Sequence, residues 1–162
     1  MIEICICPFK ALRYHFSRID PTRTAAVIST SGELPDPSRL CGISYLCLQY
    51  RDIDVEAPGC FTDADAGSIA DFIRTLDASV TTLFVCCDAA VSRSPAVAAA
   101  IARYFGQDDE ALVWKNPAYS PNMLVFEKLT RALGIPVDDD ICDRLFYENR
   151  KAFQDAIKKG RR

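Results

Sequence analysis

The sequence predicts an α/β fold in which strands and helices are mixed within one domain. Three observations support this prediction. Short runs of apolar and β-branched residues recur along the chain, and turn or helix signals separate them. The run 81–86 leads through a short loop into the segment 94–105, which is rich in alanine and apolar almost all round. The length of 162 residues suits one domain, so we expect a single domain over residues 1–162.

The strands and the first two helices are predicted from local patterns. The expected strands are residues 2–6, 24–30, 45–50 and 81–86. The first helix begins after Thr62, which can form a capping box with Asp65, and runs to about Leu76. The segment 94–105 is predicted to be a central buried helix that ends near Gly106.

Two further helices are predicted near the C-terminus. Pro121 suits the first turn of one helix, whose apolar positions are Leu124, Val125, Leu129 and Leu133. The last helix runs from the acidic residues 138–140 to residues 158–160, and the charges at its two ends suit the helix dipole.

Composition excludes several classes of function. The chain is 49% hydrophobic and 25% charged with a formal net charge of −3, as in an ordinary globular protein, and no long basic run indicates a nucleic-acid partner. No apolar run reaches the roughly 18 residues of a membrane helix, and the N-terminus does not resemble a signal peptide. We therefore expect a cytoplasmic protein without a membrane partner.

The cysteines do not indicate a disulfide framework or a metal site. A chain of this size without an export signal does not need disulfides, so reduced thiols are expected for its eight cysteines. The pairs Cys5/Cys7 and Cys86/Cys87 lack the C-x-x-C spacing of zinc sites, and His15 is the only histidine.

The loop after residues 81–86 is the best candidate for chemistry. Arg93 stands six positions after Cys87, and mostly small residues separate them, which lets successive backbone N–H groups surround an anion. The start of the following helix also favours an anion. The predicted phosphate-binding residues are Asp88, Ala89, Ala90, Val91, Ser92 and Arg93. The same spacing links Cys7 to Arg13, but Pro8 lacks an N–H group and bulky residues follow it, so the later loop is preferred.

The residue types in this loop suit phosphoryl transfer. A thiolate at Cys87 would be the nucleophile, and the planar guanidinium of Arg93 can hold two phosphoryl oxygens into the transition state. Ser94 can donate a hydrogen bond to the departing thiolate. The alternative interpretation is a buried cysteine at a strand end beside a surface arginine.

With these residues, the chain resembles the dual-specificity branch of the protein tyrosine phosphatases. Their loop usually reads H-C-x-x-G-x-x-R-[ST], and Cys87, Arg93 and Ser94 occupy its cysteine, arginine and hydroxyl positions. The resemblance implies the cysteine phosphatase fold, with a central, mostly parallel sheet flanked by helices. It also implies hydrolysis through a cysteinyl-phosphate intermediate without a cofactor or metal. Low-molecular-weight phosphatases and rhodanese-like sulfur transferases match the pattern less well.

Two further landmarks extend the resemblance. Residues 45–52 are similar to the strand that delivers the general acid in the family, which makes Asp52 the candidate acid and leaves Asp54 as an alternative. Residues 121–126 are similar to the helix start where an asparagine braces the phosphate loop, so Asn122 is expected to support the loop.

Three loop positions bear on activity and substrate. Cys86 replaces the family histidine and Ala90 replaces the glycine, so a weakly active or inactive pseudophosphatase that binds phosphorylated ligands is the alternative function. Asp88 would repel additional phosphates, and no lysine lies between Cys87 and Arg93. A phosphotyrosine or phosphoserine/threonine protein is therefore the favoured substrate, with a small phosphomonoester as the alternative. The number of subunits is not determined.

Overall fold

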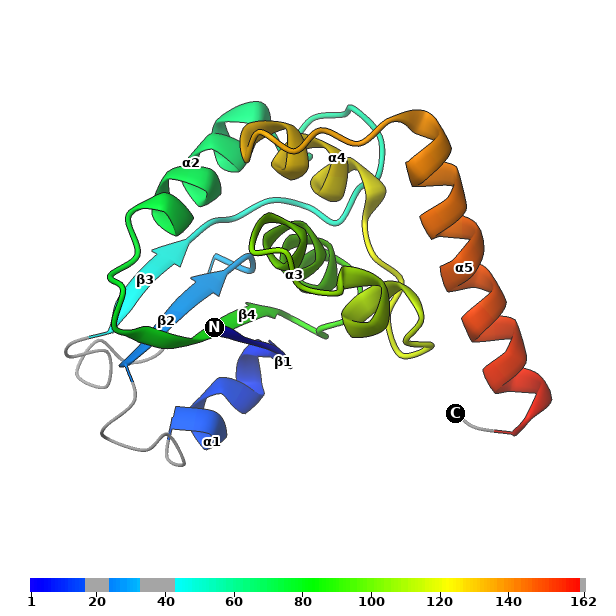
Figure 1. Cartoon of the computed structure of the whole chain (residues 1–162), viewed down its shortest axis with the longest axis horizontal. Helices are drawn as coiled ribbons and strands as arrows, with labels where there is room; N and C mark the ends of the chain where they lie inside the picture. Colours follow the sequence, from blue (N-terminus) through cyan, green and yellow to red (C-terminus); the bar gives the residue numbers. More distant parts are fainter. Residues whose placement is uncertain (17–23, 33–42, 161–162) are drawn as a thin grey trace.

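The computed structural model of the chain describes residues 1–16, 24–32 and 43–160. Four strands form one parallel sheet in the order β1-β4-β2-β3 (Figure 1). They are β1 (Glu3–Pro8), β2 (Thr24–Ser29), β3 (Ser44–Cys47) and β4 (Val80–Cys87). The four predicted strands and the predicted α/β class are confirmed.

The third strand is shorter than predicted because the chain leaves the parallel ladder after Cys47. The N–H of Leu48 still donates to the carbonyl of Ser29 at 2.8 Å, but Gln49 forms an antiparallel bridge with Ser31. Beyond the ends of β2 and β3, the two segments therefore no longer run parallel.

The central strand β4 is buried on both faces. Leu83 and Val85 belong to the main core, whereas Phe84 and Cys86 belong to a smaller apolar cluster. Successive side chains of a strand point to opposite faces, so both faces of β4 are covered. A central parallel strand is therefore apolar without alternation, as the sequence of β4 is.

Helices cover the two faces of the sheet (Figure 1). One face carries α2 (Asp63–Arg74), α3 (Arg93–Tyr104) and α4 (Met123–Ala132), and the other carries η1 (Phe9–Ala11) and α1 (Leu12–Phe16). Every residue of α3 from Ser94 to Ala102 is buried, which confirms the predicted central helix.

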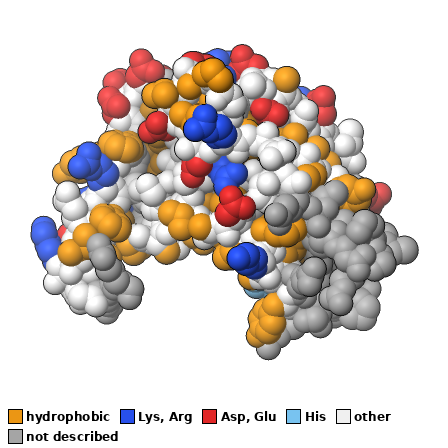
Figure 2. Space-filling view, turned by 180° about the vertical axis from the view of Figure 1, so that it is seen from behind, with side chains coloured by type: hydrophobic (Ala, Val, Ile, Leu, Met, Phe, Trp, Pro, Cys, Tyr) orange, Lys and Arg blue, Asp and Glu red, His pale blue; other side chains and the backbone are white. Residues whose placement is uncertain are grey.

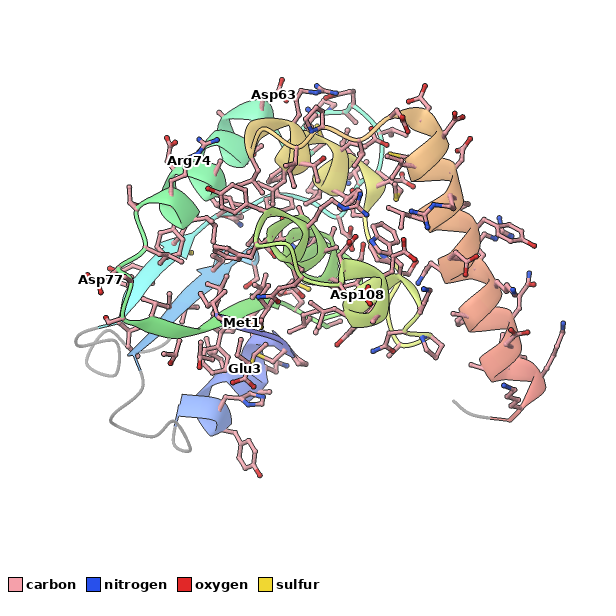
Figure 3. All side chains as sticks on the ribbon, viewed as in Figure 1. Met1, Glu3, Asp63, Arg74, Asp77 and Asp108 are labelled. Carbon is pink, nitrogen blue, oxygen red and sulfur yellow. The ribbon has the colours of Figure 1, made fainter. Side chains whose placement is uncertain are left out.

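Capping residues determine where α2 and α4 begin. The predicted capping box between Thr62 and Asp65 opens α2, whose terminal residues Asp63 and Arg74 lie at the outer edge of the molecule (Figure 3). Helix α4 begins later than predicted. Its N-cap is Asn122, whose side-chain oxygen accepts from the N–H of Val125, so the proline at 121 lies outside the helix.

The C-terminal part of the chain comprises a π-helical turn, η3 (Glu110–Trp114), and the long helix α5 (Asp139–Lys158). Helix α5 buries Cys142, Leu145 and Asn149, while Phe153 and Ile157 near its C-terminal end are about half exposed. The elements η1, α1 and η3 were not predicted, because none exceeds five residues and so none shows a helical period. In the part of the chain that the structure describes, no helix combines the length and apolar character that a membrane crossing needs.

Candidate active site

The predicted loop lies between the central strand and the central helix. Cys87 is the last residue of β4, Arg93 is the first of α3, and five residues connect them. The Cys87 side chain is buried, and its sulfur lies 3.1 Å from the hydroxyl oxygen of Ser94. The predicted nucleophile and the predicted hydroxyl donor are thus in contact.

The Arg93 side chain is held by backbone carbonyls of residues that lie outside the loop. One terminal nitrogen, Nη1, donates to the backbone carbonyls of Thr30 and Tyr50, each at 3.0 Å. These carbonyls follow β2 and β3, so the ends of two strands position the guanidinium. Within the described residues, the Nε atom of Arg93 is buried and has no hydrogen-bond partner. A buried donor without a partner is costly, and an anion in the loop would satisfy it.

The other terminal nitrogen of Arg93 contacts a residue that the sequence places beside the nucleophile. Nη2 forms an ion pair with the carboxylate of Asp88. The Arg93 side chain is only 12% exposed, whereas that of Asp88 is 69% exposed. The ion pair therefore joins a fixed cation to an anion at the surface.

The backbone of the loop is braced by the segment before α4. The carbonyl of Val91 accepts from the N–H of Ser120 at 2.8 Å, and that of Ser92 accepts from the N–H of Asn122 at 3.4 Å. Ser92 is the N-cap residue of α3, but its hydroxyl does not cap the helix. It donates to Asp52 instead, at 2.8 Å. The start of α3 therefore keeps its favourable field for an anion.

Ala90 adopts an unusual backbone conformation. Its φ angle is +56°, in the left-handed region, where a side chain beyond glycine costs about 1–2 kcal/mol. Ala90 replaces the glycine of the resembled motif, and among the described residues it is the one non-glycine residue with positive φ. The backbone of the loop is therefore strained at Ala90.

Asp52 lies against the loop, and Asp54 does not. The Oδ1 atom of Asp52 accepts from the hydroxyl of Ser92 and, at 2.9 Å, from the side-chain amide of Asn122. The same amide donates to the carbonyl of Ile53 at 3.1 Å. Asp54 is exposed, and its side chain has no hydrogen bond or ion pair within the described residues. Asn122 is buried. Its hydrogen bonds join the candidate acid, the loop and the start of α4.

A residue that sequence reasoning missed also holds the segment around Asp52. The Lys128 side chain is only 8% exposed, and its ammonium lies 2.6 Å from Glu56 and 3.9 Å from Asp63. The hydrogen bond between Lys128 and Glu56 lowers the pKa of Glu56 and raises the pKa of Lys128. The sequence signal was a lysine on the apolar side of α4, and it did not identify the distant partner.

The competing segment at Cys7 has a different environment. Cys7 and Cys86 are register partners on β1 and β4, and both belong to the smaller apolar cluster. Burial raises the pKa of Cys7 to about 12 and raises that of Cys86 as well. Cys86, at the position of the family histidine, donates its thiol to the carbonyl of Ile28 at 3.5 Å. After Cys7 in the sequence, residues 9–11 form a helical turn rather than an open loop.

The described residues contain no cluster of three or more His, Cys, Asp or Glu side chains able to hold a metal ion. Their seven cysteines are all free. The functional groups that meet at the loop are the Cys87 thiol, the Arg93 guanidinium and the Asp52 carboxylate.

A parallel sheet whose central strand ends in a cysteine loop, followed by a buried helix, defines the class of fold. The chain has a dual-specificity-phosphatase-like cysteine phosphatase fold.

The first of three similar solved structures supports this assignment of the fold. The chain is similar to PTPMT1 in complex with PI(5)P, with 16% identity and a TM-score of 0.50 over 88% of this chain and 94% of that chain. It is also similar to human DUSP28, with 14% identity and a TM-score of 0.49 over 96% and 94% of the two chains. A third similar structure is the human tyrosine phosphatase-like serine/threonine/tyrosine-interacting protein, with 22% identity and a TM-score of 0.48 over 78% and 83%. No family model and no curated protein matches the sequence.

Proposed function

We propose that this chain is a cysteine-dependent phosphomonoester hydrolase that acts on phosphorylated tyrosine, serine or threonine in proteins. The observation that carries the proposal is the grouping of Cys87, Ser94 and the unpaired Nε of Arg93 at one loop. A thiol nucleophile, a hydrogen-bond donor for that thiol and a buried cation with a free donor are the groups that this reaction needs.

In the first step, the Cys87 thiolate attacks phosphorus, an S–P bond forms and the P–O bond to the leaving group breaks. Arg93 holds two of the phosphoryl oxygens through its Nε and Nη2 groups. Protonated Asp52 gives its proton to the leaving oxygen.

In the second step, water attacks the phosphocysteine, Asp52 takes a proton from that water and the S–P bond breaks. The thiolate is restored, and the Ser94 hydroxyl donates a hydrogen bond to it.

A groove beside the loop supports a substrate larger than a metabolite. It has a volume of about 330 Å³ and lies between residues 119–120 and the second half of α5. Ser120, which lines the groove, donates its N–H to the carbonyl of Val91, so the groove lies next to the loop. A protein segment that carries the phosphorylated residue could extend into it. A reduced nucleophile of this kind fits the cytoplasm, which we propose as the location.

The test is turnover of an aryl phosphate by three proteins. Cys87→Ser should abolish turnover, because a hydroxyl is a far weaker nucleophile than a thiolate. Cys7→Ser, the matched control, should retain turnover. Vanadate binding should persist in Cys87→Ser and be strongly weakened in Arg93→Ala. Equal losses in the two cysteine variants would reject the assignment of the nucleophile.

A binding-only pseudophosphatase is the second candidate function. The positive φ of Ala90 and the absence of an imidazole at position 86 both favour it. Binding of phosphate or vanadate without turnover of good aryl phosphates by the unmodified protein would establish it.

A further inference from the structure

The donors of Arg93 are distributed unequally. Nη1 is fully used, because its two N–H groups bond the carbonyls of Thr30 and Tyr50. The N–H of Nε and one N–H of Nη2 lie along one edge of the guanidinium, and that edge is the one that holds two oxygens of a phosphate. Asp88 is paired with Nη2, and Nε has no hydrogen-bond partner in the described chain.

A phosphoryl group that binds this edge therefore competes with Asp88 for Nη2 of Arg93. Arg93 cannot turn away, because its Nη1 atom is held by two backbone carbonyls and its side chain is 12% exposed. Asp88, whose side chain is 69% exposed, is the partner that moves. Its carboxylate then remains beside the bound phosphate, where it lacks a cation and repels the phosphate charge.

A substrate can offset this loss only with a positive charge of its own. A lysine or arginine next to the phosphorylated residue would give Asp88 a new partner when Arg93 takes the phosphate. A substrate with further phosphates near the first one would instead increase the repulsion. The loop between Cys87 and Arg93 contains no lysine that could relieve it.

We propose that Asp88 is a specificity-determining residue: it competes with the phosphoryl group for Arg93, and it selects phosphorylated protein segments with a basic residue beside the phosphorylated residue. This inference rests on the proposed function, because it assigns a role to Asp88 only if the loop binds a phosphoryl group.

The first test measures binding of inorganic phosphate, by calorimetry, in the Cys87→Ser background. Asp88→Asn and Asp88→Ala should each bind phosphate about threefold to tenfold more tightly than the parent, because the competing ion pair and the repulsion are both removed. Asp143→Asn, which removes an exposed carboxylate from α5, is the matched control and should leave the affinity unchanged. Thermal unfolding of each variant verifies that the fold is retained.

The second test uses two phosphotyrosine peptides that differ only in carrying arginine or alanine next to the phosphotyrosine. The parent should prefer the arginine peptide about threefold to tenfold, and Asp88→Asn should lose this preference. If phosphate binds but the Asp88 variants match the parent in phosphate affinity and in peptide preference, the inference is wrong and the proposed function stands. If the parent binds no phosphate or vanadate at all, the proposed function fails and the inference fails with it.

Discussion

Single residues of the loop combine stabilising contacts with local strain. Arg93 forms ordinary hydrogen bonds with two backbone carbonyls and an ion pair with Asp88. Ala90, three residues earlier, holds a left-handed conformation that its side chain disfavours. Strain of this kind persists where the surroundings determine the backbone, and here the loop is braced from Ser120 and Asn122.

Ala90→Gly should relieve the strain. Glycine adopts positive φ without a steric cost, although it also increases the entropy of the unfolded chain. We expect the free energy of unfolding to rise by up to about 1 kcal/mol and kcat/KM to increase. Denaturant unfolding and aryl phosphate kinetics measure the two effects. A clear loss of stability would show that Ala90 is well accommodated.

Asp52→Asn should slow phosphoryl transfer to the enzyme by about 10²- to 10⁴-fold, because the leaving oxygen loses its proton donor. The loss should be smallest for nitrophenyl phosphate, whose leaving group needs little protonation, and largest for phosphotyrosine peptides. Asp54→Asn is the control, since the Asp54 side chain has no hydrogen bond or ion pair within the described residues. Equal slowing of both substrates, or a leaving-group effect in Asp54→Asn, would remove Asp52 from the role of acid.

At the scale of elements, α4 and α5 depend on charged contacts with distant segments. Lys128 of α4 holds Glu56 close to the segment that carries Asp52. Glu110 of η3 binds Arg144 of α5 at 2.7 Å and also binds Lys115 at 3.1 Å. These contacts join α4 to the segment before α2, and α5 to η3.

The contact between η3 and α5 should make stability depend on acid pH. Hydrogen bonds from Arg144 and Lys115 lower the pKa of Glu110 in the folded protein. A carboxyl with a lowered folded-state pKa stabilises the fold above its unfolded value and loses that contribution as the pH falls through the folded value. Between about pH 6 and pH 3, the parent should therefore lose more stability than Glu110→Gln. Asp143→Asn is the control, and parallel stability profiles for parent and Glu110→Gln would contradict this assignment.

At the scale of the whole molecule, one core joins sheet and helices. The main apolar cluster includes Ile4 of β1, Leu83 of β4, Val97 of α3, Trp114 of η3 and Leu145 of α5. Figure 2 shows acidic and basic side chains interspersed over one face, with a hollow along its lower edge. In Figure 1, the far end of α5 and the α1 side of the sheet stand on either side of that hollow.

We propose that residues 1–162 form a single domain, which predicts one cooperative unfolding transition. Trp114, the single tryptophan, is 1% exposed in the main core, so its fluorescence reports the core packing. The fluorescence transition and the loss of helical circular dichroism should have the same midpoint. Two separated midpoints would show that α5 or another part unfolds independently.

The sequence by itself determined the α/β class, the four strands and the central helix, because each depends on local patterns of apolar, capping and breaking residues. It also selected Cys87 over Cys7, since small residues with backbone N–H groups follow only the former. The short elements η1, α1 and η3 were missed because they are too brief to show a period.

Only the tertiary structure decided which distant groups meet. The contacts of Arg93 with the carbonyls after β2 and β3, of Asp52 with Asn122, and of Lys128 with Glu56 join segments far apart in the chain. Sequence spacing carries no information on such contacts, because sheet order and helix packing bring the segments together. The ion pair between Asp88 and Arg93 lies within one loop, yet it too depends on the tertiary structure: the carbonyls that fix Nη1 leave Nη2 to the carboxylate.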